Sequence, residues 1–315
     1  MQTSPKALLS RGVQQVAFQT GLSAHLARRD RVRAVVMLHG VGGTDLPKPD
    51  FERAMRWLAA EFQVLGLNEL LSRIDEGRVP EPRGEVALTF DDGLRNHVDQ
   101  AYPVLRELGL PATLFVSPGL IESGRWLWNH EIRARLSRVS DGQLSALAQT
   151  LRTASPGIEG IVAWMKTLAL EQRHAAEARI REVTADFVPT AEEREAYDPL
   201  EWDDLRRLDP ALITIGSHTV EHPILSTLED EQIEFELRRS RVWLEEALGR
   251  PVDLFCYPNG SQDMRVRHMA AQTYRAAVST VEGRVTPHLD WHAIPRVPIA
   301  AHLPLFAWRM HRPGA

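Results

Sequence analysis

The stretch LTFDDGLRN occupies residues 88–96. Its apolar and β-branched start runs directly into two adjacent carboxylates, Asp91 and Asp92, and then into Gly93. Neighbouring like charges repel each other, so a predicted strand that ends in two acids needs a compensating feature. One explanation is a helix N-cap, in which Asp92 and Gly93 begin the next helix. The other is a bound cation whose charge offsets the repulsion.

Short and nearly continuous apolar runs recur along the chain, as is typical of strands that are buried on both faces. They cover residues 34–40, 84–90, 112–116, 211–218, 252–258, 276–280 and 293–299. Helical patterns lie between them, and the clearest one spans residues 228–249 and ends at Gly249. This alternation predicts an α/β fold with a parallel sheet, either open or closed into a barrel.

Residues 121–197 interrupt the alternation, because their patterns predict helices and loops without a strand. We interpret this segment as a helical insertion on the main domain. Trp126 and Trp128 near its start are either a sugar-stacking surface or an anchor of the insertion to the core. The predicted division is a helical extension over 1–33, the main domain over 34–300 and a C-terminal tail over 301–315.

Composition and charge exclude some classes of partner. The 315 residues are 43% hydrophobic and 25% charged, which is ordinary for a soluble globular protein. A formal net charge of −5 argues against a nucleic-acid-binding protein. The chain has one cysteine, so an intrachain disulfide is excluded.

The N-terminal segment has no apolar core of signal-peptide length, and no stretch is apolar enough to span a membrane. We therefore expect a cytoplasmic protein without a transmembrane span. The segment is mildly amphipathic and rich in arginine, so peripheral contact with an anionic membrane is an alternative to an ordinary capping helix.

Polar side chains gather where the predicted strands end, which is where parallel α/β folds bind ligands. His39, the two acids and His218 each follow a predicted strand. His218 and His222 are four residues apart, so a helical turn after His218 would place both imidazoles on one side. Two imidazoles and one carboxylate suit a divalent metal and leave positions open for water and substrate. The second acid then remains free to accept a proton from water.

Several motifs resemble those of the polysaccharide deacetylase family, the NodB-homology carbohydrate esterases. TFDDG (89–93) and SHTVEH (217–222) resemble its first two motifs, and FCYPNG (255–260) resembles the YP-G variant of its third. LHGVG (38–42) and IPRVPI (294–299) resemble its first-strand and closing signatures. The resemblance spans about residues 34–300. It implies a distorted (β/α) barrel of about seven strands that carries the helical insertion.

The resemblance also implies roles for individual residues. Asp91 becomes the catalytic base, and the metal ligands become Asp92, His218 and His222. The implied metal is a divalent ion, most often Zn²⁺, with Co²⁺, Ni²⁺ and Mn²⁺ as alternatives. The backbone N–H of Asn259 becomes the donor that stabilises the oxyanion.

Two departures from the family pattern lead to further hypotheses. Cys256 stands where better-known members have the arginine that orients the base, and we predict it to be a small buried residue. We expect Arg296 to take over that contact with Asp91 from the last strand. The family's late general-acid histidine has no match here. His39 is the preferred candidate, because it follows a strand, and its alternative role is a structural histidine. The other candidates are His288, His292 and His302.

These observations predict a metal-dependent deacetylase that acts on an N-acetylated sugar in a glycan or glycan precursor. A metal-dependent amidase acting on a small amide or cyclic imide is the second hypothesis. A catalytically silent glycan-binding relative is the third. The presence of both Asp91 and Asp92 argues against the third, because a binding module has no use for the base.

Overall fold

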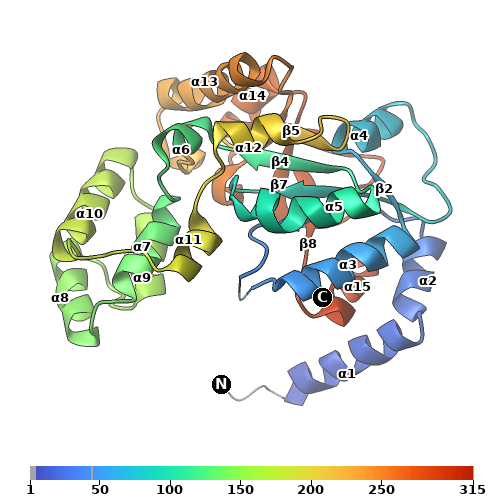
Figure 1. Ribbon diagram of the computed structural model, residues 1–315, viewed down its shortest axis with the longest axis horizontal. Coiled ribbons are helices and arrows are strands. Elements are labelled where there is room, and N and C mark those ends of the chain that lie inside the picture. The colour runs from blue at the N-terminus through green and yellow to red at the C-terminus, as the bar shows by residue number, and fades with distance from the viewer. Residues whose placement is uncertain (1–4, 44, 315) are drawn as a thin grey trace.

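The computed structural model describes residues 5–43 and 45–314, with side chains from residue 11 onward (Figure 1). The first four residues of the predicted extension and the last residue of the predicted tail therefore lie outside the described residues. The strands are β1 (Arg33–Leu38), β2 (Gln63–Leu65), β3 (Glu85–Phe90), β4 (Ala112–Val116), β5 (Ile213–Ser217), β6 (Leu254–Cys256), β7 (Ala276–Glu282) and β8 (Ile294–Pro298). Each of the seven predicted runs overlaps one of these strands, although β1 begins one residue before its run and β7 ends two residues after its run.

Parallel pairing closes the sheet on itself. The strand order is β1-β8-β7-β6-β5-β4-β3-β2, and β3 also pairs with β1 along its whole length, from Arg33↔Glu85 to Leu38↔Phe90. On its other edge, β3 pairs with β2 over its first half and with β4 over its second half. Seven strands thus form the closed barrel, and the short β2 lies beside it. The predicted distorted (β/α) barrel of about seven strands is confirmed.

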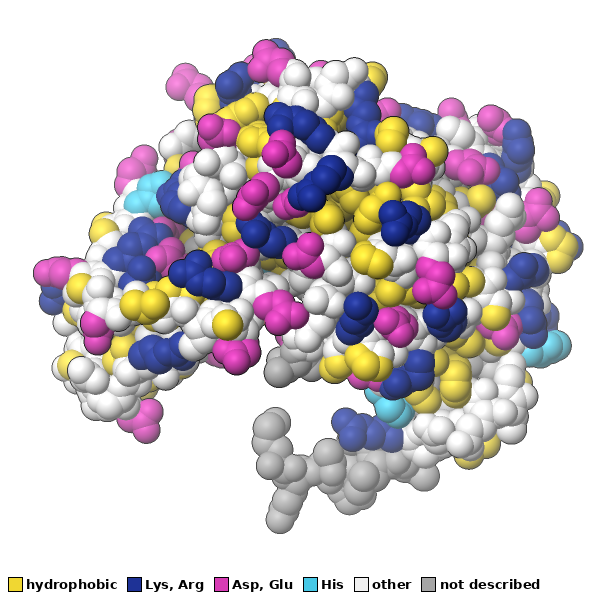
Figure 2. Space-filling model, viewed as in Figure 1, with side chains coloured by type: hydrophobic (Ala, Val, Ile, Leu, Met, Phe, Trp, Pro, Cys, Tyr) yellow, Lys and Arg dark blue, Asp and Glu magenta, His cyan; other side chains and the backbone are white. Residues whose placement is uncertain are grey.

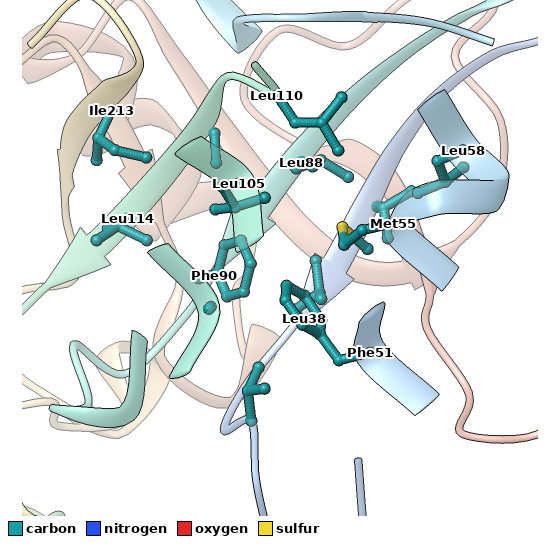
Figure 3. Packing of buried hydrophobic residues seen from close by; sticks show 14 of the residues in the cluster. Leu38, Phe51, Met55, Leu58, Leu88, Phe90, Leu105, Leu110, Leu114 and Ile213 are labelled. Carbon is teal, nitrogen blue, oxygen red and sulfur yellow. The ribbon is translucent and has the colours of Figure 1, made fainter. Parts of the chain in front are cut away.

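Alternation along β3 separates the barrel interior from the surrounding helices. Val86, Leu88 and Phe90 point outward into a large apolar cluster, whereas Ala87 belongs to a second cluster inside the barrel. Figure 3 shows the outer packing, in which Phe90 meets Phe51 of helix α3 (Lys48–Glu61), their ring centroids 6.1 Å apart. Because side chains alternate, Asp91 continues the inward row and so begins the interior of the site.

Helices surround the barrel on its outer side (Figure 1). Those of the barrel and its ends are α1 (Pro5–Gln19), α2 (Leu22–Arg29), α3 (Lys48–Glu61), α4 (Leu67–Asp75), α5 (Tyr102–Leu108), α6 (Pro118–Ser123), α12 (Trp202–Arg207), α13 (Asp230–Leu248), α14 (Met264–Thr273) and α15 (Leu303–His311). A π-helical turn (His97–Ala101) precedes α5, and 3₁₀ turns cover Leu225–Thr227 and Pro258–Gly260. The segment predicted as a C-terminal tail thus contains α15, which packs against α1 and α2.

The segment between α6 and α12 forms a lobe of helices beside the barrel (Figure 1). Its helices are α7 (Trp128–Leu136), α8 (Asp141–Leu151), α9 (Ile158–Met165), α10 (Leu170–Val183) and α11 (Ala191–Tyr197). The lobe has its own apolar cluster, which includes Trp128, Ile132 and Ile161. On the face shown in Figure 2, basic and acidic side chains are interspersed over both the lobe and the barrel.

Candidate active site

Three strands of the barrel are followed by polar side chains at their carboxyl ends. β3 leads into Asp91 and Asp92, β5 leads into His218, and β1 leads into His39. β3 pairs with β1 on one side and with β4 on the other, and β4 pairs with β5. The closed barrel therefore brings residues that are far apart in sequence to one mouth, as expected for a parallel barrel.

Asp92, His218 and His222 form a buried cluster with three potential metal-binding atoms. The Nε2 atoms of both histidines lie 3.5 Å from Oδ1 of Asp92, and the three atoms are all within 4.8 Å of one another. Asp92 has a left-handed backbone conformation, with φ at 76°. This sharp turn directs its side chain differently from the neighbouring Asp91, although both follow the same strand.

The turn that brings His222 to the cluster is not helical, so the conditional expectation of a helical turn after His218 was wrong. Thr219 and His222 have φ values of 67° and 55°, in the left-handed region. The Thr219 hydroxyl accepts a hydrogen bond from the backbone N–H of His222, at 3.0 Å. The Glu236 carboxylate of α13 accepts hydrogen bonds from the N–H groups of Val220, at 2.7 Å, and Glu221, at 3.3 Å. These contacts replace the bonds that a helix would have supplied.

The donor set of the cluster fits a divalent metal ion. Nδ1 of His218 lies 2.7 Å from the Cys256 carbonyl oxygen, where it acts as a donor, so Nε2 is the nitrogen that faces Asp92. Burial lowers the pKa of His218, but Cys256 and Asp92 outweigh it and hold the pKa above its usual value, so a bound metal would replace the Nε2 proton. Burial lowers the pKa of His222 to about 3, so its ring is neutral. Burial raises the pKa of Asp92, but hydrogen bonding to His218 outweighs this and keeps the pKa below its usual value. Neutral imidazoles and an ionised carboxylate are the forms in which these groups bind zinc.

Arg296 holds Asp91 at two points inside the barrel. Its Nη1 and Nη2 donate to Oδ1 and Oδ2 of Asp91, each at 2.7 Å. Nε donates to the Ser279 carbonyl oxygen at 2.8 Å, and Nη1 also donates to the Thr89 hydroxyl at 3.0 Å. Both members of the ion pair are buried. The contact expected from the last strand is therefore present.

The electrostatics of this pair keep Asp91 ionised. Burial alone raises the pKa of Asp91, but the charge and hydrogen bonds of Arg296 outweigh it and lower the pKa to about 2. Cys256, which stands at the position of the arginine in the family motif, is fully buried, and its Sγ lies 3.4 Å from Nη2 of Arg296. It thus borders the same ion pair and belongs to the core, as predicted.

His39 lies at the edge of this arrangement. Its Nε2 is 3.9 Å from Oδ2 of Asp91, and about half of its side chain (52%) is exposed. Its carbonyl oxygen lies 3.1 Å from Nε2 of the buried His97. Of the other candidate histidines, His292 contacts the Tyr274 carbonyl oxygen near the amino ends of β7 and β8, away from the site.

Asn259 lies in the turn that follows β6, as predicted. It has φ at 56°, and its side-chain oxygen accepts a hydrogen bond from Lys166 of the insertion at 2.5 Å. His302, another candidate acid, precedes α15, and His288 lies in the connection between β7 and β8. Neither position contributes to the buried cluster of Asp92.

A cleft of about 350 Å³ opens beside Asp92 and His39. Residues that the sequence analysis did not single out also line it: Asn96, His130 and Tyr197. Asn96 carried a recognisable signal, since it is a polar residue shortly after the acids at a strand end. His130 and Tyr197 carried none, because they lie in helices of the insertion, outside every motif.

Comparisons with known proteins agree with this geometry. A model of the polysaccharide deacetylase family matches residues 78–277, more than half of the chain. YxkH of Bacillus subtilis (strain 168), whose name assigns it to the polysaccharide deacetylases, is 33% identical over 86 residues. That match covers 26% of this chain and 30% of the length of YxkH.

Solved structures show the same fold at low sequence identity. The Streptococcus pyogenes deacetylase PplD in complex with acetate is 17% identical, with a TM-score of 0.62 over 90% of this chain and 99% of that one. IcaB from Ammonifex degensii is also 17% identical, with a TM-score of 0.59 over 89% and 97% of the two chains. From the family match and the agreement in fold, this chain belongs to the polysaccharide deacetylase family of hydrolases.

Proposed function

We propose that this protein is a metal-dependent deacetylase that hydrolyses an acetyl group, most readily an N-acetyl group, on a sugar of a glycan or glycan precursor. One observation carries the proposal. The buried cluster of Asp92, His218 and His222 lies next to a separate carboxylate, Asp91, which Arg296 keeps ionised. A structural site needs only the ligands, whereas hydrolysis also needs a base at hydrogen-bonding distance from the attacking water.

The three ligands would hold a divalent ion, most often Zn²⁺, with Co²⁺, Ni²⁺ and Mn²⁺ as alternatives. Such an ion polarises a carbonyl oxygen and lowers the pKa of water. Hydrogen bonding of His218 to Cys256 determines which ring nitrogen faces the cluster, and Glu236 supports the turn that carries His222. These residues act by orienting the ligands, not by touching the substrate.

The remaining steps belong to residues of the chain. Asp91 accepts the proton of the water as its oxygen attacks the acetyl carbon, and Arg296 keeps the carboxylate aimed at that water. The backbone N–H of Asn259 donates to the oxygen that becomes negatively charged. When the carbon–nitrogen bond breaks, His39 donates a proton to the leaving nitrogen, and the proton on Asp91 then returns to His39 through solvent. The products are acetate and a free amine.

Among the three hypotheses, the two enzymes agree better with the site than the binding module does. A silent glycan-binding relative gives no reason for the buried pair of Asp91 and Arg296, because burying an ion pair carries a desolvation cost and a binding module gains nothing from the base. The amidase hypothesis shares the same chemistry and differs only in substrate. A panel of substrates therefore distinguishes the two enzymes.

We also propose a cytoplasmic location, with peripheral membrane contact through the N-terminal helices as an alternative to a capping role alone. No helix among the described residues is long and apolar enough to cross a membrane. Val13, Val16 and Leu22 expose about half of their surface on α1 and α2. Arg28 and Arg29 lie in the last turn of α2. Exposed apolar side chains beside arginines favour an anionic bilayer surface. Co-sedimentation with anionic but not neutral vesicles, reversed by salt, is the expected result.

Acetate release tests the activity directly. Metal-stripped protein should be inactive on acetylated saccharides, and protein reconstituted with Zn²⁺ should release acetate from at least one of them. A matched panel of small amides and cyclic imides decides between the two enzyme hypotheses. Release from small amides alone would replace the saccharide with the second hypothesis, and release from neither class would reject both.

A further inference from the structure

The helical insertion contributes two aromatic side chains to the cleft of the barrel. His130 lies on α7 and Tyr197 ends α11, and both line the cleft beside Asp92 and His39. Their ring centroids are 4.6 Å apart, with an angle of 37° between the ring planes. Both residues are partly exposed, so their rings present surface to whatever enters the cleft. We refer to this pair of rings as the aromatic wall.

Packing behind the aromatic wall keeps it in place. The Trp126 ring packs edge-on against Tyr197, with centroids 5.4 Å apart, and its N–H donates to Asp198 at 2.7 Å. The Phe187 ring also packs edge-on against Trp126, with centroids 6.4 Å apart. Trp126 thus supports the wall from behind, while Trp128 is buried in the core of the insertion. Neither tryptophan lines the cleft, so the aromatic surface at the site comes from His130 and Tyr197.

Hydrogen bonds attach the wall to the loop that follows the two acids. Asn96 accepts from the N–H of Val41 at 3.1 Å and donates to the carbonyl oxygens of Glu195, at 3.2 Å, and Ala196, at 3.1 Å. One buried side chain therefore joins the segment after His39, the loop after Asp92 and the end of the insertion. The N–H of Leu200 adds a bond to the Gly93 carbonyl oxygen at 2.9 Å. A wall held in this way is pre-organised, which lowers the entropic cost of binding.

The surfaces around the cleft match a sugar ring. Leu46, Leu94 and Ile299 supply apolar lining, and Asp45 supplies a carboxylate. A pyranose ring has apolar C–H faces and a rim of hydroxyl groups, so it needs aromatic or aliphatic surface together with a few polar partners. Burial lowers the pKa of His130, so its ring is uncharged at neutral pH and suits an apolar contact.

We propose that the aromatic wall is a saccharide subsite that packs against a pyranose ring of the acetylated substrate. This inference rests on the proposed deacetylase function and extends it to residues outside every motif of the family. The wall contributes binding of the sugar and takes no part in proton transfer. Removal of either ring should therefore lower activity on saccharides and leave unchanged the activity on a small acetyl compound that has no sugar ring.

The experiment compares two substrates in the metal-reconstituted enzyme. They are the best saccharide from the acetate-release panel and 4-nitrophenyl acetate. Tyr197→Ala and His130→Ala should each lower kcat/KM for the saccharide about tenfold, mainly through KM, since stacking against one aromatic ring has effects of this order. Hydrolysis of 4-nitrophenyl acetate should change less than twofold. Tyr197→Phe should restore saccharide activity because it keeps the ring.

Further variants separate binding from folding. Tyr197→Leu keeps bulk against Trp126 but removes the aromatic face, so it should fold and still lose saccharide binding. Phe235→Ala is the matched control, since Phe235 is an exposed ring (58%) on α13, outside the cleft. Calorimetric titration of the deacetylated product into the metal-free proteins should show tighter binding to the wild type and Tyr197→Phe than to Tyr197→Leu and Tyr197→Ala. Equal losses on both substrates, or no loss on the saccharide, would overturn the subsite. A wild-type enzyme that is active on no saccharide would instead remove the proposed function on which it rests.

Discussion

Replacing Arg296 by lysine tests whether the two-point contact with Asp91 is needed for turnover. Lysine keeps one positive charge but has a single nitrogen, whereas Arg296 uses three nitrogens in a planar group. In the structure these nitrogens bind both carboxylate oxygens of Asp91 and the carbonyl oxygen of Ser279. Arg296→Lys therefore removes at least one bond to Asp91 and leaves the buried carbonyl oxygen of Ser279 without its guanidinium donor.

The contacts set the size of the expected effect. A hydrogen bond to a charged group contributes about 1.5–3 kcal/mol, and an unpaired buried acceptor costs about 1–3 kcal/mol. Together they predict that the free energy of unfolding falls by about 3–5 kcal/mol, the range for a broken buried ion pair. Turnover should fall about 100-fold, because the base is no longer held in orientation. In the wild type, Arg296 holds the pKa of Asp91 low against the effect of burial. With this contact weakened in Arg296→Lys, the pKa of Asp91 should rise, so the acid limb of the kcat/KM profile should move to higher pH.

Acetate release against pH measures turnover, and urea unfolding measures stability. Arg206→Lys is the matched control, because Arg206 pairs with Asp203 at the surface, where both side chains are more than half exposed. It should change stability by less than about 0.5 kcal/mol. Wild-type turnover in Arg296→Lys, with an unchanged acid limb, would show that the two-point contact does not orient the base.

Three other changes test the remaining parts of the site. Asp91→Asn should lower kcat about 10²–10⁴-fold with unchanged metal content by elemental analysis, since only the proton acceptor is lost; near-normal activity would make Asp91 a structural residue. Chelation should abolish activity and lower the melting temperature, because a ligand bound only to the folded state stabilises it; activity in verified metal-free protein would contradict the assigned ligands. Glu236→Gln tests whether the raised pKa of Glu236 makes the free energy of unfolding depend on pH. Burial raises the pKa of Glu236 from 4.5 to about 7, so the contribution of this group to stability is greatest below pH 4.5 and is lost as pH rises through 7. The loss is about 3 kcal/mol between pH 4.5 and 8. The glutamine variant should lose this component of the urea-unfolding profile, and an unchanged profile would rule out Glu236 as its source.

The barrel and most of the site could be predicted because the signals are local in sequence. A strand buried on both faces must be apolar throughout, so each barrel strand left a continuous run. Polar residues that end such runs must meet at one mouth once the sheet closes, which located Asp91, His218 and His39. β2 was missed because three residues, Gln63–Leu65, are too few to show a period. The C-terminal α15 did carry a signal, since Phe306, Ala307 and Met310 recur at helical spacing and are buried.

The aromatic wall and the non-helical turn could not be predicted from local patterns. His130 and Tyr197 are separated by most of the insertion, and only the packing of its helices against the barrel brings them together. The turn after His218 depends on Glu236 from the next long helix, α13, whose carboxylate binds two backbone N–H groups. Such contacts depend on tertiary structure, which overrides the helical spacing suggested by two histidines four residues apart.

Backbone strain is concentrated in the turns that follow the strands and carry the site residues. Six non-glycine residues of the described chain have positive φ, and four of them belong to the site: Asp92, Thr219, His222 and Asn259. Each such residue costs roughly 1–2 kcal/mol relative to an ordinary conformation. Glycine would avoid this cost, but it cannot supply the carboxylate of Asp92 or the imidazole of His222. A side chain that must point back over the mouth of the barrel requires the chain to turn sharply at the end of its strand. The strain is therefore a consequence of placing ligands there, and the closed barrel and its buried hydrogen bonds stabilise the turns that carry them.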